Sequence, residues 1–327
     1  MQYSTFAAID IGSYDVILEI FEISKKQGIR SVDKICHRME LGKDTYTLGK
    51  IRPEMEEELC RVLADFVRIM EGYRVDDYRA TASSAISEAS NSLYVLGKIH
   101  QLTGLSVTVL SNSEQRFLSY KALAAMEDNF NKIIEKGTAI LDLDGGSFQI
   151  SLFDKDALVT TQNIRMGSLR IRERLAGIQS ETEHYEEMVE ELIWNEVSSF
   201  KKMYLKDRKI ENIMLIGDVF TDSVYQNIEE KTTKIISREN FNTWYEKIIR
   251  QSPMELAVKL GIPLENASLM YPSAVIYKCL IDMMGAEHIW IPGVHMTRGI
   301  AYEYAEQMKL LKGGHNFEND ILMAAKK

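Results

Sequence analysis

The chain has 327 residues, of which 45% are hydrophobic and 27% charged, an ordinary composition for a globular protein. Disordered and fibrous classes are therefore excluded, and the length predicts about two domains. Lys and Arg number 39 and Asp and Glu 48, so the net charge is −9. An acidic chain is a poor candidate for binding nucleic acid, because that affinity comes mainly from basic contacts to phosphates.

The cysteines and the apolar runs indicate the compartment. Cys36, Cys60 and Cys279 are odd in number and far apart, so the sequence has no disulfide framework and no zinc spacing. The N-terminus has no basic segment followed by a long apolar stretch. No run elsewhere approaches the ~18 apolar residues of a membrane-spanning helix. We therefore expect a cytoplasmic protein with no membrane partner.

The first part of the chain alternates strand and helix patterns. Short apolar runs bounded by glycine, serine or polar loops predict strands at 6–11, 16–23, 34–41, 78–81 and 106–110. Apolar residues at helical spacing predict a helix opened by Pro53, a second at 84–100 and a third that starts at Asn112 and ends before Gly137. The polar stretch 42–50 is predicted to be a loop.

The second part restarts the strand pattern. Apolar runs predict strands at 138–143, 148–153 and 212–216, the last of them ended by Gly217. Capping-box patterns predict two helices, one from Ser180 with Glu183 and one from Ser252 with Glu255. This alternation favours an α/β fold. We divide it into an N-terminal domain at 1–125, a second domain at 126–300, and a C-terminal helix and tail at 301–327.

A weak internal repeat links the two parts. The segments AIDIGS, containing Asp10 and Gly12, and LDLDGGS, containing Asp142 and Gly145, share one plan: a buried strand, an acidic residue near its end and a Gly/Ser turn. A carboxylate at a strand end can hold a cation or its water shell, and glycine lets backbone amides approach phosphate. Two such turns would form a phosphate clamp. The alternative of two plain β-hairpins with glycine turns remains open at this point.

Six blocks occur in a fixed order along nearly the whole chain: AAIDIGS, SSAISEASN, TGLSVTVLSNSEQ, LDLDGGS, RMGSLR and TRGIAYEY. In order and spacing they resemble the exopolyphosphatase and guanosine pentaphosphate phosphatase (Ppx/GppA) family, within the actin-like superfamily of sugar kinases, Hsp70 and actin. The resemblance implies two ribonuclease H-like (actin-like ATPase) domains with the site in a cleft between them. It also implies Mg²⁺-dependent release of the terminal phosphate from polyphosphate or guanosine pentaphosphate, and homodimers as a common state.

The resemblance assigns roles to both turns. By match to the family's motifs, Gly12 and Ser13 belong to a first phosphate-binding loop. The second phosphate-binding loop contains Gly145, Gly146 and Ser147. The acidic residues of the two blocks are the metal-ligand candidates, and they are Asp10, Asp142 and Asp144.

Several phosphate-handling positions depart from the family's pattern. Tyr14 follows the first loop where the family has Asn, and Ser87 stands at the position of a phosphate-binding Arg. In the second block, Asp144 replaces a glycine and Gln149 replaces an acid. Further along, the family's Gly-Gly-Thr turn appears as Gly-Asp-Val at 217–219. The loss of Arg at position 87 and the gain of Asp144 both make the site less favourable for a polyanion.

The catalytic base is the most important departure. The family's Glu aligns with Gln115, whose carboxamide can orient a water molecule but cannot accept its proton. The neighbouring Glu114 is the first candidate to replace it, although one residue of offset on a helix turns the side chain by about 100°. Glu114 and Gln115 are therefore the catalytic candidates. Two hypotheses remain, an exopolyphosphatase-type hydrolase and a weak or inactive family member that binds a phosphorylated ligand; an actin-like ATPase or sugar kinase is third.

Overall fold

A computed structural model of the chain describes residues 3–126, 130–176, 185–206, 208–217, 220–221, 223 and 234–310. These residues form two compact units. The first comprises 3–125 and 295–310, and the second comprises the described residues between 126 and 294.

The first unit is built on a five-stranded sheet in the order β3-β2-β1-β4-β5. The neighbours β1 and β4 are parallel, as are β4 and β5, whereas β2 and β3 join by antiparallel pairing. Residues 6–9 of β1 are completely buried, as expected of a central strand covered on both faces. The strands are β1 (Ser4–Ile11), β2 (Asp15–Ser24), β3 (Gly28–Arg38), β4 (Asp77–Ala82) and β5 (Val107–Val109).

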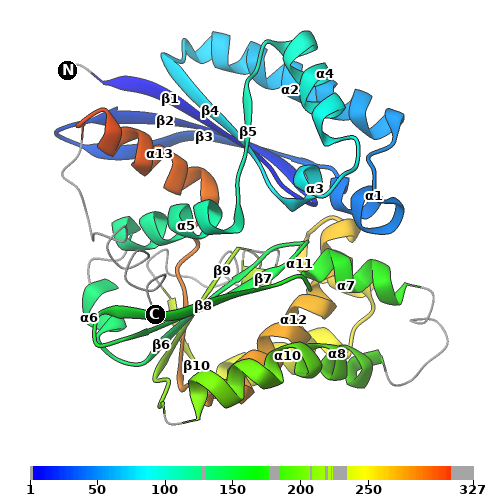
Figure 1. Cartoon of the computed structure of the whole chain (residues 1–327), viewed down its shortest axis with the longest axis vertical. Helices are drawn as coiled ribbons and strands as arrows, with labels where there is room; N and C mark the ends of the chain where they lie inside the picture. The colour runs from blue at the N-terminus through cyan, green and yellow to red at the C-terminus, as the bar shows by residue number, and fades with distance from the viewer. Residues whose placement is uncertain are drawn as a thin grey trace. The chain divides into compact units, whose positions relative to one another are not determined.

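Helices cover both faces of this sheet (Figure 1). On one face, Ile9 and Ile11 of β1 pack in a core with Leu59 and Phe66 of α2. On the other face, Phe6 stacks on Tyr304 of α13 with ring centroids 4.1 Å apart. The helices are α1 (Leu41–Leu48), α2 (Pro53–Tyr73), α3 (Ser84–Ser87), α4 (Ser92–Thr103), α5 (Asn112–Met126) and α13 (Met296–Gln307).

The second unit holds a six-stranded sheet in the order β10-β11-β9-β6-β7-β8. Read from β8, this order repeats that of the first unit, with β6 in the place of β1, β9 in that of β4 and β11 in that of β5. The strand β10 is added at the edge, antiparallel to β11. The strands are β6 (Thr138–Leu143), β7 (Phe148–Asp154), β8 (Ala157–Ile164), β9 (Asn212–Ile216), β10 (Lys234–Ser237) and β11 (His288–Ile291).

The longest helix of the second unit, α12, crosses its core. Tyr277 of α12 is completely buried, packs on Phe220 at 5.4 Å between ring centroids, and donates its hydroxyl to the Ile216 carbonyl at 3.2 Å. The helical elements are α6 (Phe130–Ile134), α7 (Ser168–Leu175), α8 (Tyr185–Phe200), the π-helix η1 (Lys201–Leu205), α10 (Arg238–Ile249), α11 (Pro253–Leu260) and α12 (Leu264–Met284).

The sequence predicted some elements closely. The strands at 138–143 and 212–216 are confirmed with the same bounds, and so is the capping box of Ser252 and Glu255. The predicted capping box of Ser180 and Glu183 lies outside the described residues.

Two predicted elements and one predicted domain boundary differ from the structure, and one strand was missed. The supposed loop at 42–50 contains α1, which ends at Gly49 in the left-handed conformation. The supposed helix at 84–100 is interrupted, because the Asn91 side chain exchanges two hydrogen bonds with the backbone of Ile51. The strand β8 was not predicted. The boundary drawn at residue 300 falls inside α13, which packs on β1, β2 and β3.

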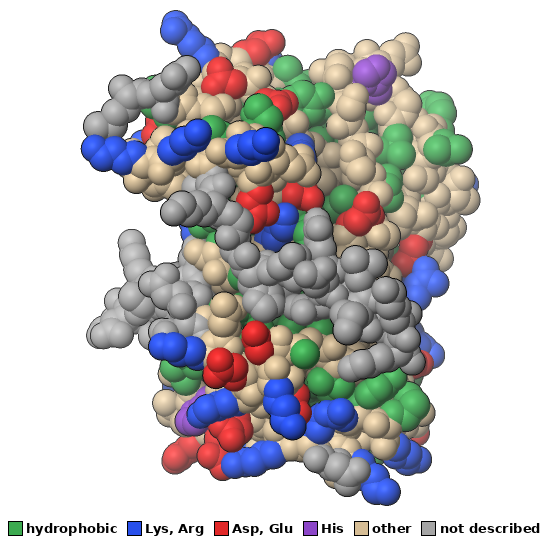
Figure 2. Space-filling model, turned by 60° about the vertical axis from the view of Figure 1, so that its left-hand side comes forward, with side chains coloured by type: hydrophobic (Ala, Val, Ile, Leu, Met, Phe, Trp, Pro, Cys, Tyr) green, Lys and Arg blue, Asp and Glu red, His purple; other side chains and the backbone are tan. Residues whose placement is uncertain are grey.

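The surface carries mixed charge on the face shown in Figure 2, where basic side chains are interspersed with acidic ones. Such a mixture differs from the basic strip expected of a nucleic-acid binder. Within the part of the chain that the structure describes, no helix has both the length and the apolar character needed to cross a bilayer.

Candidate active site

The carboxyl ends of the parallel strands in the first unit bring the candidate residues of that unit together. Asp10 lies opposite Thr81 in the parallel pairing of β1 with β4, and the Thr81 hydroxyl donates to Asp10 Oδ1 at 3.4 Å. The next parallel strand, β5, leads into α5, which carries Glu114 and Gln115. In open α/β sheets, ligands bind outside the carboxyl ends of the strands. This edge is therefore the candidate site of the first unit.

The first turn uses its own polar groups internally. The Gly12 amide donates to the Asp15 carbonyl oxygen at 2.8 Å. Ser13 is completely buried, and its hydroxyl lies 2.7 Å from the Tyr46 hydroxyl, which in turn lies 2.8 Å from the Ser84 hydroxyl. The turn is thus fastened to α1 and α3. The two groups predicted to bind phosphate, the Gly12 amide and the Ser13 hydroxyl, are already engaged in the fold.

Glu114 is the third residue of α5 and forms a capping box with Ser111, the residue that precedes the helix. Its Oε2 accepts hydrogen bonds from the Ser111 amide and the Ser111 hydroxyl, both at 2.7 Å, and its own amide donates back to the Ser111 hydroxyl at 3.3 Å. These hydrogen bonds to the charged form lower the pKa of Glu114. A carboxylate with a lowered pKa is a weaker base, so the geometry disfavours Glu114 as the group that deprotonates water.

Gln115 follows Glu114 on α5 and lies about 100° around the helix from it. Its side chain is buried, and its Nε2 donates to the Leu110 carbonyl at 3.2 Å. The Leu110 amide in turn donates to the Ala82 carbonyl at the end of β4. This chain of hydrogen bonds fixes the carboxamide near the strand ends, where it can orient a water molecule.

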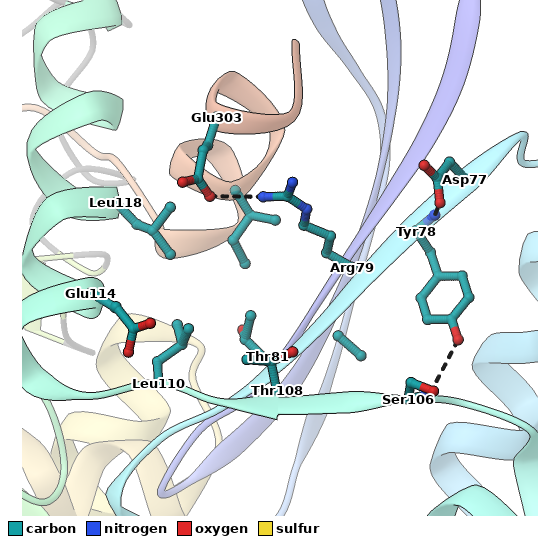
Figure 3. Close-up of a pocket in the computed structure, with 12 residues that line it drawn as sticks. Asp77, Tyr78, Arg79, Thr81, Ser106, Thr108, Leu110, Glu114, Leu118 and Glu303 are labelled. Carbon is teal, nitrogen blue, oxygen red and sulfur yellow. Dashed lines mark hydrogen bonds and ion pairs between the residues drawn. The ribbon is translucent and has the colours of Figure 1, made fainter. Parts of the chain in front are cut away.

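A pocket of about 460 Å³ lies in the first unit beside the strand ends (Figure 3). Glu114 on α5 lines it across from Thr81 and Arg79 on β4, and the Arg79 guanidinium pairs with Glu303 at 2.7 Å. With Asp77, the lining holds three carboxylates and one guanidinium. Three carboxylates around one guanidinium make this pocket unfavourable for a phosphate chain.

The second turn is also closed on itself. The Asp144 amide donates to the Ser147 carbonyl at 2.9 Å, and Asp144 Oδ1 accepts from the Gly145 amide at 2.6 Å. The Ser147 hydroxyl accepts from Asn163 at 3.2 Å, and Arg170 Nε donates to the Gly146 carbonyl at 2.9 Å. Asp144 therefore uses one carboxylate oxygen within its own turn.

Two glycines make room for this turn. A Cβ on Gly167 would collide with the carbonyl oxygens of Asp144 and Gly145. Gly217, at the end of β9, has a φ of +102°, and a Cβ there would lie 2.6 Å from both Asp142 Oδ1 and the Leu143 carbonyl oxygen. The acidic strand end is consequently packed against glycine backbone. Asp218 and Val219, which follow Gly217, lie outside the described residues.

Asp142 lies directly opposite Gln149 in the antiparallel pair of β6 and β7, and Gln149 lies opposite Asn163 of β8. Gln149 is only 6% exposed, and its Oε1 is a buried oxygen without a hydrogen-bond partner in the part of the chain described. An orphaned buried acceptor beside a carboxylate fits a missing cation or a missing hydrogen-bond donor. Asp142 with Gln149 is therefore the candidate site of the second unit.

These donors suit Mg²⁺. Carboxylate and amide oxygens are hard ligands, and proteins commonly hold Mg²⁺ with one or two carboxylates, several waters and substrate phosphates. Among the residues the structure describes, no three His, Cys, Asp or Glu side chains gather into a ready-made metal cage. A Mg²⁺ site with few protein ligands, completed by water and substrate, would use such oxygen donors without a ready-made cage.

The chain matches the family model described as the Ppx/GppA phosphatase family over residues 19–308. It belongs to this family. The match begins in β2, after the first turn, and continues through α13. The order of the sequence blocks therefore identified the family correctly.

Curated relatives of the Ppx/GppA protein match it at low identity. A bifunctional 3-dehydroquinate synthase/phosphatase of Fusobacterium nucleatum is 21% identical over 310 residues, which cover 86% of this chain and 44% of the relative. Exopolyphosphatase 1 of Mycobacterium leprae is 25% identical over 144 residues, 44% of this chain and 41% of the relative. The matches span less than half the length of these relatives.

Solved structures share the fold of the Ppx/GppA protein. An exopolyphosphatase from Cytophaga hutchinsonii superposes with a TM-score of 0.84 at 17% identity, over 95% of this chain and 100% of the other. The family member of Aquifex aeolicus superposes with a TM-score of 0.75 at 18% identity, over 94% and 99%. The predicted α/β class with two actin-like domains is confirmed.

Proposed function

We propose that the chain is a phosphohydrolase that releases the terminal phosphate from polyphosphate or from guanosine pentaphosphate with the help of Mg²⁺. The observation that carries this proposal is the repeat of one device in two topologically equivalent places. Asp10 near the end of β1 and Asp142 near the end of β6 each precede a glycine turn at the carboxyl edge of a parallel strand pair. Family membership supports the same reaction class.

Asp10 in the first unit and Asp142 in the second are each proposed as Mg²⁺ ligands, and the amide oxygen of Gln149 would add a neutral ligand beside Asp142. The ion would neutralise charge on the phosphoryl oxygens. Phosphoryl transfer proceeds through a loose transition state, so catalysis depends mainly on positioning and electrostatics. GTPases orient their attacking water with a glutamine, and buried Gln115 suits the same role. The proposed reaction therefore needs no strong base. The role of Glu114 in it is to stabilise the start of α5.

A second function is favoured by one observation: Gln115 and Gln149 are both amides where the family has acids. Each change removes a negative charge but also removes a proton acceptor. A family member with both changes could bind a phosphorylated ligand and turn it over weakly or not at all. This binding protein is the alternative to the hydrolase.

We also propose a cytoplasmic location for the protein. No disulfide joins Cys36, Cys60 and Cys279, all of which lie in described segments. Thiols kept reduced are usual in the cytoplasm. Homodimers, which the family resemblance implies, remain a prediction for measurement in solution.

Phosphate release separates the two functions. The purified chain is incubated with long-chain polyphosphate or guanosine pentaphosphate, with and without Mg²⁺, and inorganic phosphate is measured alongside calorimetric binding of each compound. Mg²⁺-dependent release supports the hydrolase. Binding without release supports the alternative, and the absence of both binding and release contradicts both proposals.

A further inference from the structure

Arg38, the last residue of β3, reaches the first turn from a part of the sequence that carries no family motif. It lies opposite Asp15 in the antiparallel pair of β2 and β3. Asp10 lies opposite Ile17, two residues along β2 from Asp15. Because cross-strand partners and alternate residues of a strand share a face, Arg38, Asp15 and Asp10 lie on the same face at the same end of the sheet.

Two residues hold the Arg38 guanidinium. Its Nη1 donates to Asp15 Oδ2 at 2.8 Å, and its central carbon lies 5.7 Å from the centroid of the Tyr14 ring. Position 14 is one of the sites where this chain departs from the family's pattern. The ion pair and the cation–π contact together fix the guanidinium beside the turn.

To bind an anion, the first turn would use a positively charged side chain. The Gly12 amide is engaged with the Asp15 carbonyl, and the Ser13 hydroxyl is buried against Tyr46, so neither of these groups offers a donor to an anion. At position 87, where the family has Arg, the chain has an exposed Ser. Arg38 supplies the positive charge at the turn instead.

The geometry suits a guanidinium that binds phosphate. Arg has five N–H donors in a rigid fork, of which Nη1 donates to Asp15, and the Arg38 side chain is 33% exposed. Asp15, by contrast, is buried with 12% of its side chain exposed. Asp10, Asp15 and Arg38 carry a combined formal charge of −1. Without Arg38 that charge becomes −2, which repels a phosphate chain.

We propose that Arg38, positioned by Asp15 and Tyr14, binds the phosphoryl oxygens of the ligand and replaces the arginine that the chain lacks at position 87. The inference rests on the proposed function. It adds to that function the residue that makes the first turn able to hold an anion.

Calorimetric titration with tripolyphosphate in the presence of Mg²⁺ tests the inference. Arg38→Gln is expected to weaken binding about 10- to 100-fold, the usual effect of losing charged hydrogen bonds. Arg38→Lys keeps the charge but loses the fork, so its affinity should be intermediate. The matched control is Arg30→Gln, because Arg30 lies on the same strand and pairs with Glu22 but sits toward its other end. Its affinity should equal that of the wild type.

A double variant distinguishes direct binding of phosphate by Arg38 from simple neutralisation of the Asp15 charge. If Arg38 only neutralised Asp15, removing both charges in Asp15→Asn/Arg38→Gln would restore wild-type affinity. The inference predicts that the double variant stays at least about 10-fold weaker than the wild type. Thermal melting of each variant verifies folding.

The outcomes are distinct. Unchanged affinity in Arg38→Gln, or full recovery in the double variant, overturns the role of Arg38 while leaving the proposed function intact. A wild-type chain that does not bind tripolyphosphate at all contradicts the proposed function itself.

Discussion

Gln115 donates its side-chain amide to the Leu110 carbonyl at 3.2 Å, and this bond holds the carboxamide at the start of α5 near the ends of the parallel strands. The relationship explains how a residue without useful basicity can still serve hydrolysis. A carboxamide anchored through its nitrogen keeps its oxygen as an acceptor for one proton of a water molecule.

Gln115→Glu should raise the rate of phosphate release, because a carboxylate adds a proton acceptor to a site that already positions water. General bases contribute about 100-fold or more, so an increase of at least about 10-fold in kcat is expected. The thermal midpoint should fall, since a carboxylate cannot donate to the Leu110 carbonyl. Gln115→Ala is the control: it removes the amide without adding a base and should lower kcat. An unchanged kcat in Gln115→Glu would show that Gln115 does not face the attacking water.

Glu114→Gln should leave phosphate release nearly unchanged but destabilise the helix start. The companion variant Ser111→Ala removes the other half of the cap and should cost about 0.5–2 kcal/mol of unfolding free energy. Ser252→Ala, in the equivalent capping box of α11, is the matched control in the second unit. Loss of phosphate release in Glu114→Gln, with a normal melting temperature, would restore Glu114 as the base.

The stabilising effect of Glu114 should depend on pH. Its pKa is lowered in the folded chain, so the folded state favours the carboxylate. This contribution is present in full above the ordinary pKa of 4.5 and is lost as the pH falls through the lowered pKa of the folded state. The difference in melting temperature between wild type and Glu114→Gln should therefore be largest near neutral pH and shrink in acid. A constant difference across that range would mean that the charge of Glu114 does not stabilise the folded chain.

Asp142→Asn should weaken Mg²⁺ binding and reduce phosphate release by at least about 10-fold, because an amide is a neutral and weaker ligand than a carboxylate. The control is Asp154→Asn, which changes an acidic residue at the opposite end of the same hairpin. Calorimetry with Mg²⁺ and a phosphate assay should show a loss in the first variant only. Equal effects of the two substitutions would point to general charge and not to a metal site.

Gly217→Ala should destabilise the second unit and distort its acidic strand end. The backbone there has a positive φ, and the added Cβ would meet Asp142 Oδ1 and the Leu143 carbonyl oxygen at 2.6 Å. A cost of about 1–3 kcal/mol in unfolding free energy is expected. The control Gly72→Ala lies inside α2 with no atom near its Cβ, and it should stabilise the helix by up to about 1 kcal/mol. A neutral Gly217→Ala would mean that the strand end relaxes freely.

The parts of the fold that follow from local sequence were predictable. Apolar runs that end in Asp and Gly predicted β1 and β6. The order of the motif blocks along the chain identified the family. The register of the strands then placed Asp10 and Asp142 at equivalent carboxyl edges.

The parts that depend on contacts between distant segments were not predictable. The burial of the Ser13 hydroxyl against Tyr46 needs α1 to fold over the turn, and α1 itself lies in a stretch that looked like a loop. Arg38 belongs to no motif, and its place on the same face and at the same end of the sheet as Asp10 follows only from the pairing of β1, β2 and β3. Gln149 was noticed as a lost acid, but its unpartnered oxygen is visible only once its burial is known.

The most direct test of the account is a single-turnover measurement of phosphate release from tripolyphosphate by the wild type and by Asp10→Asn, each with saturating Mg²⁺. The account predicts Mg²⁺-dependent release by the wild type and a loss of at least about 10-fold in Asp10→Asn, with both proteins folded. Release that is equally fast in both proteins, or no release by a wild-type chain that binds the compound, would contradict it.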